Sequence, residues 1–263
     1  MINGDMMSDT SIRHVRQRTG RFSVIEYDRD VSVNPATAET EYFCGKMNFK
    51  RKQLVVNLNN NGGVVLQRGI MQMMVGQINM TSNIQGVGDF AKKLIGSKVT
   101  KESASKPLYT GAGTILCEPT YKYILIEDLA NWGGAVTIDD GLFLACEDTA
   151  QIKVVSRSNL SSAVLGGEGL FNTSLQGKGL IVLESDVPRE ELMEFTLEND
   201  TIKIDGNMAI AWSNSLEFKV EKAAASLMGS AVSGEGFVNV YRGTGKILVK
   251  PLPSKSAPVL VRA

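Results

Sequence analysis

The sequence predicts an all-β protein made of three consecutive, similar β-sandwich units, with one short helix in an insertion. Glycine supplies 26 of the 263 residues, above the usual share of about 7%, and helix interiors disfavour glycine. Short apolar runs broken by Gly, Asn, Asp and Ser recur roughly every 8 to 12 residues, which is typical of sandwiches and barrels. A glycine pattern also repeats along the chain, as described below.

Residues 1–20 are expected to form a flexible leader ahead of the first strand. Arg13, Arg16 and Arg18 make this leader locally basic. A solvated tail is the favoured interpretation, and an electrostatic contact with an acidic partner is the alternative. His14, the single histidine of the chain, is expected to be a solvated residue of this tail.

The first β unit is expected over residues 21–106. Residues 59–63 (NNNGG) should form a turn, because Asn and Gly accept positive φ at low cost. A helical insertion is expected at about 81–106, where the apolar residues of 88–96 have helical spacing after Asp89, a suitable N-cap. Strands of this unit are expected at 22–27, 53–58, 64–67 and 70–75.

The second β unit is expected over 107–165 and the third over 166–263. Residues 188–193 fit either a single helical turn or a strand with outward charges, and both remain open. The clearest strands of these two units are expected at 121–126, 135–138, 142–146, 152–155, 179–183, 201–204, 208–212, 216–220, 237–241 and 246–249.

A glycine repeat leads to the division into three units. Motifs of the form G-x-G, each followed by apolar strand residues, recur at intervals of 66 residues. A G-x-G motif can cradle phosphate where it opens a helix, but these motifs open strands, so a tight turn or bulge between strands is favoured. Glu168 and Glu235 occupy matching G-E-G elements and are expected at turns or interfaces. The structural glycines are Gly111, Gly113, Gly177, Gly179, Gly243 and Gly245.

Composition excludes several classes of function. The chain has 28 basic and 28 acidic side chains, whereas a general nucleic-acid binder usually carries a basic surplus. One histidine excludes any site with two histidine ligands, and a histidine general base unless the tail folds back. Cys44, Cys117 and Cys146 are odd in number and far apart, which favours a reducing compartment. No apolar run is long enough to span a membrane, and a cytoplasmic location is expected.

The remaining candidate sites each have a plainer interpretation. Lys50, Arg51 and Lys52, with Phe49, are a weak candidate for nucleic-acid binding, although a solvated strand end accounts for them. Cys117 and Cys146 lie in apolar runs and are expected to be inert core residues.

Two further sets of residues are weighed in the same way. An all-oxygen metal site is conceivable but less favoured than ordinary turns; its ligands would be Asp139, Asp140, Glu147 and Asp148. Met71 and Met73 should share one face of a strand, where core packing is favoured over a subunit interface.

Several stretches together resemble a known family. GGEGLFNTSLQGKGLIVLES (166–185), DDGLFLACE (139–147), IDGNMAIAW (204–212) and GVGDFAKKLIG (86–96) carry the resemblance. They resemble a bacterial family of unknown function related to the "altered inheritance of mitochondria" protein of fungal mitochondria. The resemblance covers roughly residues 20–250.

The resemblance implies a fold and an assembly. Members of the family look like three copies of a small β-sandwich similar to the tryptophan RNA-binding attenuation protein, in the double-stranded β-helix group, and form a ring-like trimer. The resemblance supplies no activity, cofactor or catalytic residue. Metal-binding relatives of that fold group use two or three histidines, which this chain lacks.

We therefore expect a non-enzymatic assembly or scaffold protein without a cofactor, forming a ring-like homotrimer. The alternative is a small-molecule or nucleic-acid binding module that uses clefts between β units. An enzyme that uses paired carboxylates is the third hypothesis.

Overall fold

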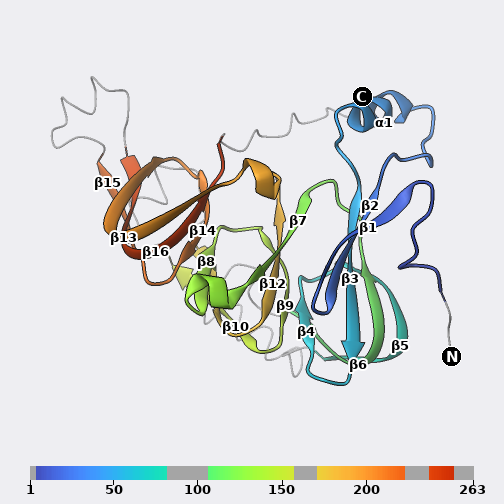
Figure 1. The fold of residues 1–263 in the computed structure, drawn as a ribbon, viewed down its shortest axis with the longest axis horizontal. Coiled ribbons are helices and arrows are strands. Elements are labelled where there is room, and N and C mark those ends of the chain that lie inside the picture. The colour runs from blue at the N-terminus through green and yellow to red at the C-terminus, as the bar shows by residue number, and fades with distance from the viewer. Residues whose placement is uncertain (1–3, 82–105, 157–170, 223–236, 252–263) are drawn as a thin grey trace, which may run out of the picture. The chain divides into compact units, whose positions relative to one another are not determined.

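The computed structural model describes residues 4–81, 106–156, 171–222 and 237–251 (Figure 1). These residues are mostly antiparallel β strands, which confirms the all-β class. The helical elements are α1 (Ala38–Lys46) and the short 3-10 helices η1 (Leu129–Trp132) and η2 (Arg189–Glu191). The strands are β1 (Arg13–Thr19), β2 (Phe22–Tyr27), β3 (Lys52–Asn59), β4 (Val64–Leu66), β5 (Met71–Thr81), β6 (Leu108–Cys117), β7 (Tyr123–Asp128), β8 (Ala135–Ile138), β9 (Phe143–Glu147), β10 (Ala150–Ser156), β11 (Phe171–Gly177), β12 (Leu180–Ser185), β13 (Met193–Asp205), β14 (Ala209–Ser213), β15 (Glu217–Lys222) and β16 (Phe237–Val249).

The strands form two sheets. The first has the order β1-β2-β3-β6-β4-β9-β12-β7, with β5 also paired to β6. The second has the order β10-β11-β8-β14-β16-β13, with β15 also paired to β16.

Contacts divide the chain into two compact units, which does not confirm the expected boundaries of three consecutive units. Unit 1 comprises Met1–Asp128, Phe143–Gln151 and Gly177–Ser185, and unit 2 comprises Leu129–Leu142, Ile152–Gln176 and Asp186–Ala263.

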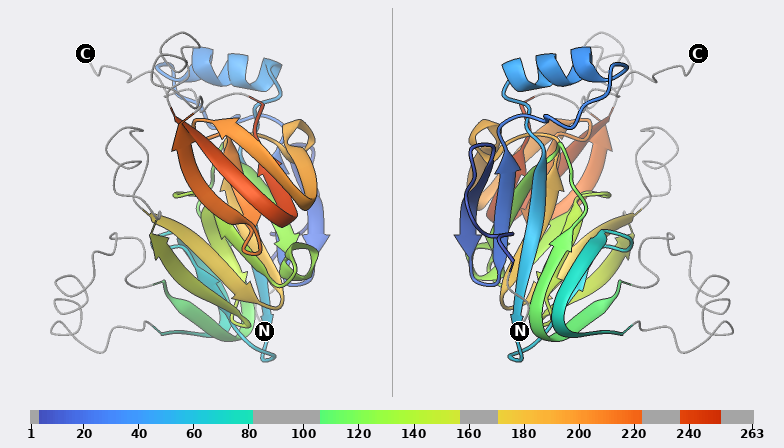
Figure 2. Two further views of the ribbon diagram at one scale, coloured as in Figure 1. Left: turned by 90° about the vertical axis from the view of Figure 1, so that its left-hand side faces the viewer. Right: turned by 90° about the vertical axis from the view of Figure 1, so that its right-hand side faces the viewer.

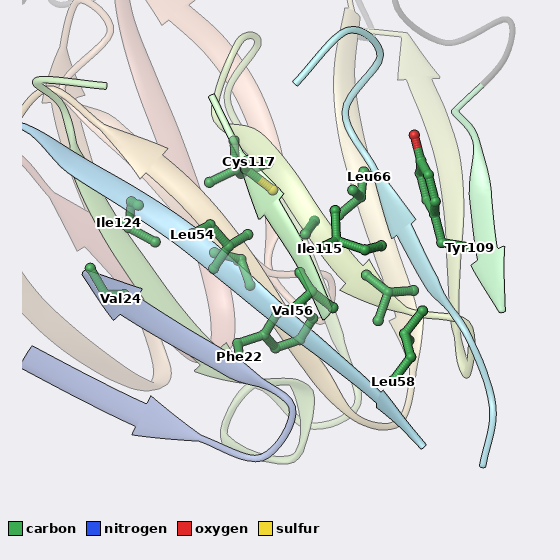
Figure 3. Close-up of a cluster of buried hydrophobic side chains, with 14 residues drawn as sticks. Phe22, Val24, Leu54, Val56, Leu58, Leu66, Tyr109, Ile115, Cys117 and Ile124 are labelled. Carbon is green, nitrogen blue, oxygen red and sulfur yellow. The ribbon is translucent and has the colours of Figure 1, made fainter. Parts of the chain in front are cut away.

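Each unit has its own apolar core. In unit 1, Phe22, Leu54, Val56 and Ile115 are fully buried in one cluster (Figure 3). Burying a side chain of this size stabilises the fold by about 1.5–3 kcal/mol. In unit 2, the core includes an aromatic group in which the rings of Trp212, Phe218 and Tyr241 lie 5.2 to 5.7 Å apart. These separations are favourable for ring pairs.

The strand pairings follow one scheme around β6, around β11 with β12, and around β16. Before the G-x-G glycines, β6 pairs with β4 and the end of β5, and β11 pairs with β8 and β10. The corresponding part of β16 pairs with the end of β13 and with β15. After the glycines, β6 pairs with β3 and with the start of β5, and β12 pairs with β7 and β9. The last part of β16 pairs with the start of β13 and with β14.

The prediction of a flexible leader is wrong for Arg13–Thr19, which forms β1 and pairs antiparallel with β2. Its arginines bond to acidic and carbonyl groups, for example Arg16 Nη2 to Asp28 Oδ1 at 2.8 Å. Cross-strand pairs of opposite charge stabilise a strand that lacks apolar alternation. The polar sequence of this segment therefore hid a strand.

One expected helix is not tested, one observed helix was not expected, and two local features agree with the expectation. The expected helix at 88–96 lies outside the described residues, whereas α1 was not expected. α1 buries none of its side chains, so its sequence carries no apolar stripe that would reveal it. The 59–63 turn is present, with positive φ at Asn60 and Gly62, and η2 provides the helical turn expected as one option before β13.

Candidate functional site

The first glycine of each G-x-G motif bends a long strand or ends it. Gly111, Gly177 and Gly243 have φ of +115°, +122° and +121°, a conformation that side chains with a β-carbon rarely adopt. We expected turns between strands at these motifs. Only Gly177, at the end of β11, fits that description, because the other two lie inside β6 and β16. The pairing partners change at each motif: within β6 and β16, and between β11 and β12.

The second glycine of a motif makes room for neighbouring side chains. A β-carbon on Gly245 would lie 2.8 Å from both the Cβ of Ser213 and the Oγ of Ser215. Gly179 is crowded in the same way by Glu147 and Thr149. Glu168 and Glu235, the acidic residues of the G-E-G elements, lie outside the described residues.

The basic trio is engaged in ion pairs. Lys50 Nζ lies 3.1 Å from Asp28 Oδ1 and 3.4 Å from Glu26 Oε1, and Arg51 Nη1 lies 2.8 Å from Asp30 Oδ2. Lys52 is buried, and this burial lowers the pKa of its ammonium group. Three neutralised and partly buried charges contribute little to binding a phosphate backbone.

His14 is not a solvated tail residue. Its Nε2 lies 2.8 Å from Asp28 Oδ2, and its side chain is three-quarters buried in β1. A hydrogen bond from Lys50 is the largest influence on Asp28 and, with His14, holds the pKa of that carboxyl below its usual value. The chain does fold back as a histidine base would require, but the imidazole joins a structural charge network.

The thiols of unit 1 differ in accessibility. Cys117 and Cys146 are buried, and burial raises the pKa of each thiol to about 12. Both are therefore protonated near neutral pH and poor nucleophiles. Cys44, on α1, is half-buried, and burial raises the pKa of its thiol as well.

The acidic candidates have structural partners. Glu147 accepts hydrogen bonds from Arg21 Nε and from the backbone N–H of Leu180, both at 2.9 Å. Asp148 accepts one from the backbone N–H of Gly63 at 2.5 Å. The backbone N–H of Asp139 donates to the carbonyl of Ile210, and Asp140 is exposed. Within the described ranges, no group of three or more His, Cys, Asp or Glu side chains could hold a metal ion.

The two predicted methionines do not share one face. A register shift lies between Met71 and Met73 in the pairing of β5 with β6. Met71 packs against the core of unit 1, whereas Met73 and its neighbour Met74 are exposed. A bulge adds one residue to a strand and so breaks the alternation that put both side chains on one face.

Exposed apolar side chains lie on two strand edges. β5 pairs only with β6 among the described residues, and β13 pairs only with β16. β5 exposes Met73, Met74 and Met80, and β13 exposes Met193 and Phe195. An unpaired strand edge offers a row of backbone N–H and C=O groups to another strand. Apolar side chains along such an edge favour its coverage by a partner.

The described chain contains two strand junctions of one kind. β4 pairs antiparallel with β9, with Val65 opposite Cys146. β8 pairs antiparallel with β14, with Thr137 opposite Trp212. In each junction, the strand that pairs ahead of the G-x-G glycines of one segment lies beside the strand that pairs after the G-x-G glycines of the next segment. Sequence reasoning found the glycines but not these junctions, because register between distant strands leaves no local signal.

A hollow of about 500 Å³ lies beside α1 in unit 1. The lining side chains include both charges, with Asp30 and Glu41 against Arg29 and Lys46. The hydroxyl of Tyr121 donates a 2.5 Å hydrogen bond to Glu41 Oε2 and so ties α1 to the rest of the unit.

Comparison with known proteins relates the chain to one family. Residues 47–252 match the sequence model described as "Mitochondrial biogenesis AIM24". An uncharacterized protein of Streptococcus pyogenes serotype M6 is 30% identical over 205 residues, which are 75% of this chain and 80% of that protein. A crystal structure of a Streptococcus pyogenes protein, 28% identical, superposes with a TM-score of 0.57 and covers 78% of this chain and 89% of its own. No helix within the described ranges is long and apolar enough to cross a membrane.

Proposed function

Because the chain belongs to the mitochondrial biogenesis AIM24 family, we propose that it is a non-enzymatic assembly protein forming a ring-like homotrimer. Two of the strands that have a single partner among the described residues, β5 and β13, would join neighbouring copies through their free edges. This observation carries the proposal, because each edge lacks a described partner and is lined with exposed apolar side chains.

The pairing of the central strands supports a division of the chain into three repeats. The central strands of the three segments align at intervals of 66 residues, so that Ile115, Ile181 and Ile247 are equivalent. The residues opposite them are Met74, Cys146 and Trp212. The shared pairing scheme around β6, β11 with β12, and β16 supports this alignment. Three segments that pair in one way are the expected product of a repeated sequence unit.

The junctions inside the chain indicate how the free edges of two copies would meet. Val65 and Thr137 lie opposite Cys146 and Trp212 in the two described junctions. Lys203 pairs with Val240, and Val240 lies 66 residues after the residue that pairs with Thr137. Lys203 is therefore the equivalent of Val65 and Thr137 in the third segment. The same junction between copies would place Lys203 of one copy opposite Met74 of the next.

We infer that these contacts between copies close into a ring. A head-to-tail contact that repeats from copy to copy gives a closed ring when its rotation closes, and an open filament otherwise. Three copies per ring are what the resemblance to the family suggests. Burial of Met73 and Met74, which are exposed on this part of β5, would stabilise each contact.

The absence of enzymatic activity is part of the proposal. The described candidate groups already have structural roles: His14 bonds to Asp28, Glu147 to Arg21, and Cys117 and Cys146 are buried. The ion pairs of the basic trio give less support to nucleic-acid binding. We place the protein in the cytoplasm because its cysteines are free thiols.

Light scattering and directed disulfide formation test the proposal. In a Cys44→Ser background, Met74→Cys with Lys203→Cys should give covalent dimers and trimers under mild oxidation. The native mass should be three times that of the chain, or a multiple of three chains. Met74→Cys with Glu198→Cys is the matched control, because Glu198 is an exposed residue of the same strand outside the predicted register. A strictly monomeric protein, cross-links only within one chain, or equal cross-linking in the control would overturn the proposal.

A further inference from the structure

The segment around α1 exposes an unusual number of apolar side chains. Tyr42 is 59% exposed, Phe43 56% and Met47 80%. α1 buries none of its own residues, and it lies beyond the ends of β2 and β3 rather than on a face of their sheet (Figure 1, Figure 2). Together with Val31, Val33 and Phe49, these side chains make up half of the exposed large hydrophobic residues among those described. Clustered exposed apolar groups mark interaction surfaces.

The helix is held in a defined position, so this exposure is not that of a loose end. Tyr121 donates its hydroxyl to Glu41, and the ring of Phe49 stacks on that of Tyr121 with centroids 5.4 Å apart. Burial and the Glu41 carboxylate raise the pKa of Tyr121, which keeps its hydroxyl a donor. The region matched by the family model begins at residue 47, whereas α1 ends at Lys46. α1 itself therefore precedes the matched region, whereas Met47 and Phe49 lie within it.

We propose that α1 is a two-fold contact between two copies of this chain, in which the helices pack antiparallel. The charges of the helix complement themselves in that arrangement, because Glu39 lies in the first turn and Lys46 in the last turn. An antiparallel pair places Glu39 of each copy beside Lys46 of the other. A two-fold interface needs one patch that is complementary to itself.

The aromatic residues occupy the centre of this patch. Tyr42 and Phe43 lie midway between Glu39 and Lys46 in the sequence, and their rings contact each other edge-on with centroids 5.4 Å apart. In the antiparallel pair, these rings from both copies meet at the two-fold axis, with the charged pairs around them. Buried aromatic side chains surrounded by polar groups are typical of interface centres. Antiparallel packing also aligns the two helix dipoles favourably.

This contact is independent of the strand edges. If the chain forms rings through β5 and β13, α1 joins two rings and doubles their mass. If the chain forms no ring, α1 gives a dimer. Variants at the edges of β5 and β13 should change the number of copies per ring, whereas variants on α1 should change the native mass by a factor of two. Failure of the ring proposal and failure of the α1 contact are therefore distinguishable.

Light scattering of the full chain and its variants tests the inference. Tyr42→Ser with Phe43→Ser should halve the native mass while the far-UV circular dichroism stays that of the wild type. Val155→Ser, a comparably apolar and exposed position on β10, is the matched control and should leave the mass unchanged. The halving should appear across micromolar concentrations at which the wild type keeps its full mass.

A charge exchange provides a second readout that a purely structural role of α1 would not reproduce. Glu39→Lys alone should halve the mass, since it places lysines against lysines, and Glu39→Lys with Lys46→Glu should restore it. An unchanged mass in the double serine variant, or no recovery after the exchange, would overturn the inference. Flotation with anionic phospholipid vesicles that depends on Tyr42 and Phe43, without any change of mass, would overturn it too and assign the surface to lipid.

Discussion

Alanine substitutions at two G-x-G motifs separate backbone strain from steric crowding. Gly177 and Gly243 have nearly the same φ, +122° and +121°. A β-carbon on Gly177 would lie 2.5 Å from the carbonyl oxygen of Thr149, whereas one on Gly243 would lie 3.3 Å from that of Ser215. The two variants therefore share the strain of positive φ and differ in the space available.

The magnitudes follow from these two terms. Positive φ costs a residue with a β-carbon about 1–3 kcal/mol, and Gly243→Ala should lower the free energy of unfolding by about that amount. Contact with a backbone oxygen cannot be relieved by a rotamer change, and overpacking of this kind adds about 1–3 kcal/mol. Gly177→Ala should therefore lose about 2–6 kcal/mol in total.

Urea denaturation followed by far-UV circular dichroism measures both losses. Gly69→Ala is the control for strain alone, because Gly69 has φ of +83° and no atom within 4 Å of an added β-carbon. Gly69→Ala and Gly243→Ala should lose similar amounts, and Gly177→Ala should lose the most. Equal losses at Gly177 and Gly243, or a greater loss at Gly243, would refute the account of crowding at the end of β11.

Two further predictions concern titrating groups. A hydrogen bond from Lys246 is the main cause that lowers the pKa of Glu194 in the folded protein. As the pH falls, the Glu194 carboxylate takes up a proton in the unfolded chain before it does so in the folded protein. The stability that this group contributes is therefore lost below about pH 4.3, the ordinary pKa of a glutamate side chain. The urea midpoint of Glu194→Gln should fall less between neutral pH and the acid range than the midpoint of the wild type. The same dependence of the midpoint on pH in both proteins would contradict this. For the thiols, iodoacetamide at neutral pH should label Cys44 in the native protein, and Cys117 and Cys146 only after denaturation. Native labelling of the buried pair, read by peptide mass spectrometry, would show that their burial is not maintained in solution.

The strand content was predictable because apolar runs between glycines and turn residues are local signals. The β3 and β14 regions were expected close to their observed bounds, and the turn at 59–63 was expected from its Asn and Gly residues. Burial of Cys117 and Cys146 followed from the apolar runs around them. Each of these features depends on neighbouring residues alone.

Other elements could not be predicted from local patterns. β1 is held by ion pairs from Arg16 to Glu26 of β2 and to Asp28 just after β2, so its polar sequence resembled a tail. α1 buries no side chain and therefore has no apolar stripe. The bulge between Met71 and Met73 depends on the register with β6, which only the paired strands determine.

The sequence by itself determined the all-β class, the repeated glycines and the exclusion of sites with two histidine ligands, because composition and spacing are properties of the chain alone. Only the tertiary structure decided which strands pair, which charges neutralise one another and which apolar side chains stay exposed. These depend on register between segments far apart in the chain, where a shift of one residue moves a side chain to the opposite face. The open edges of β5 and β13 and the uncovered aromatic residues of α1 belong to this second group.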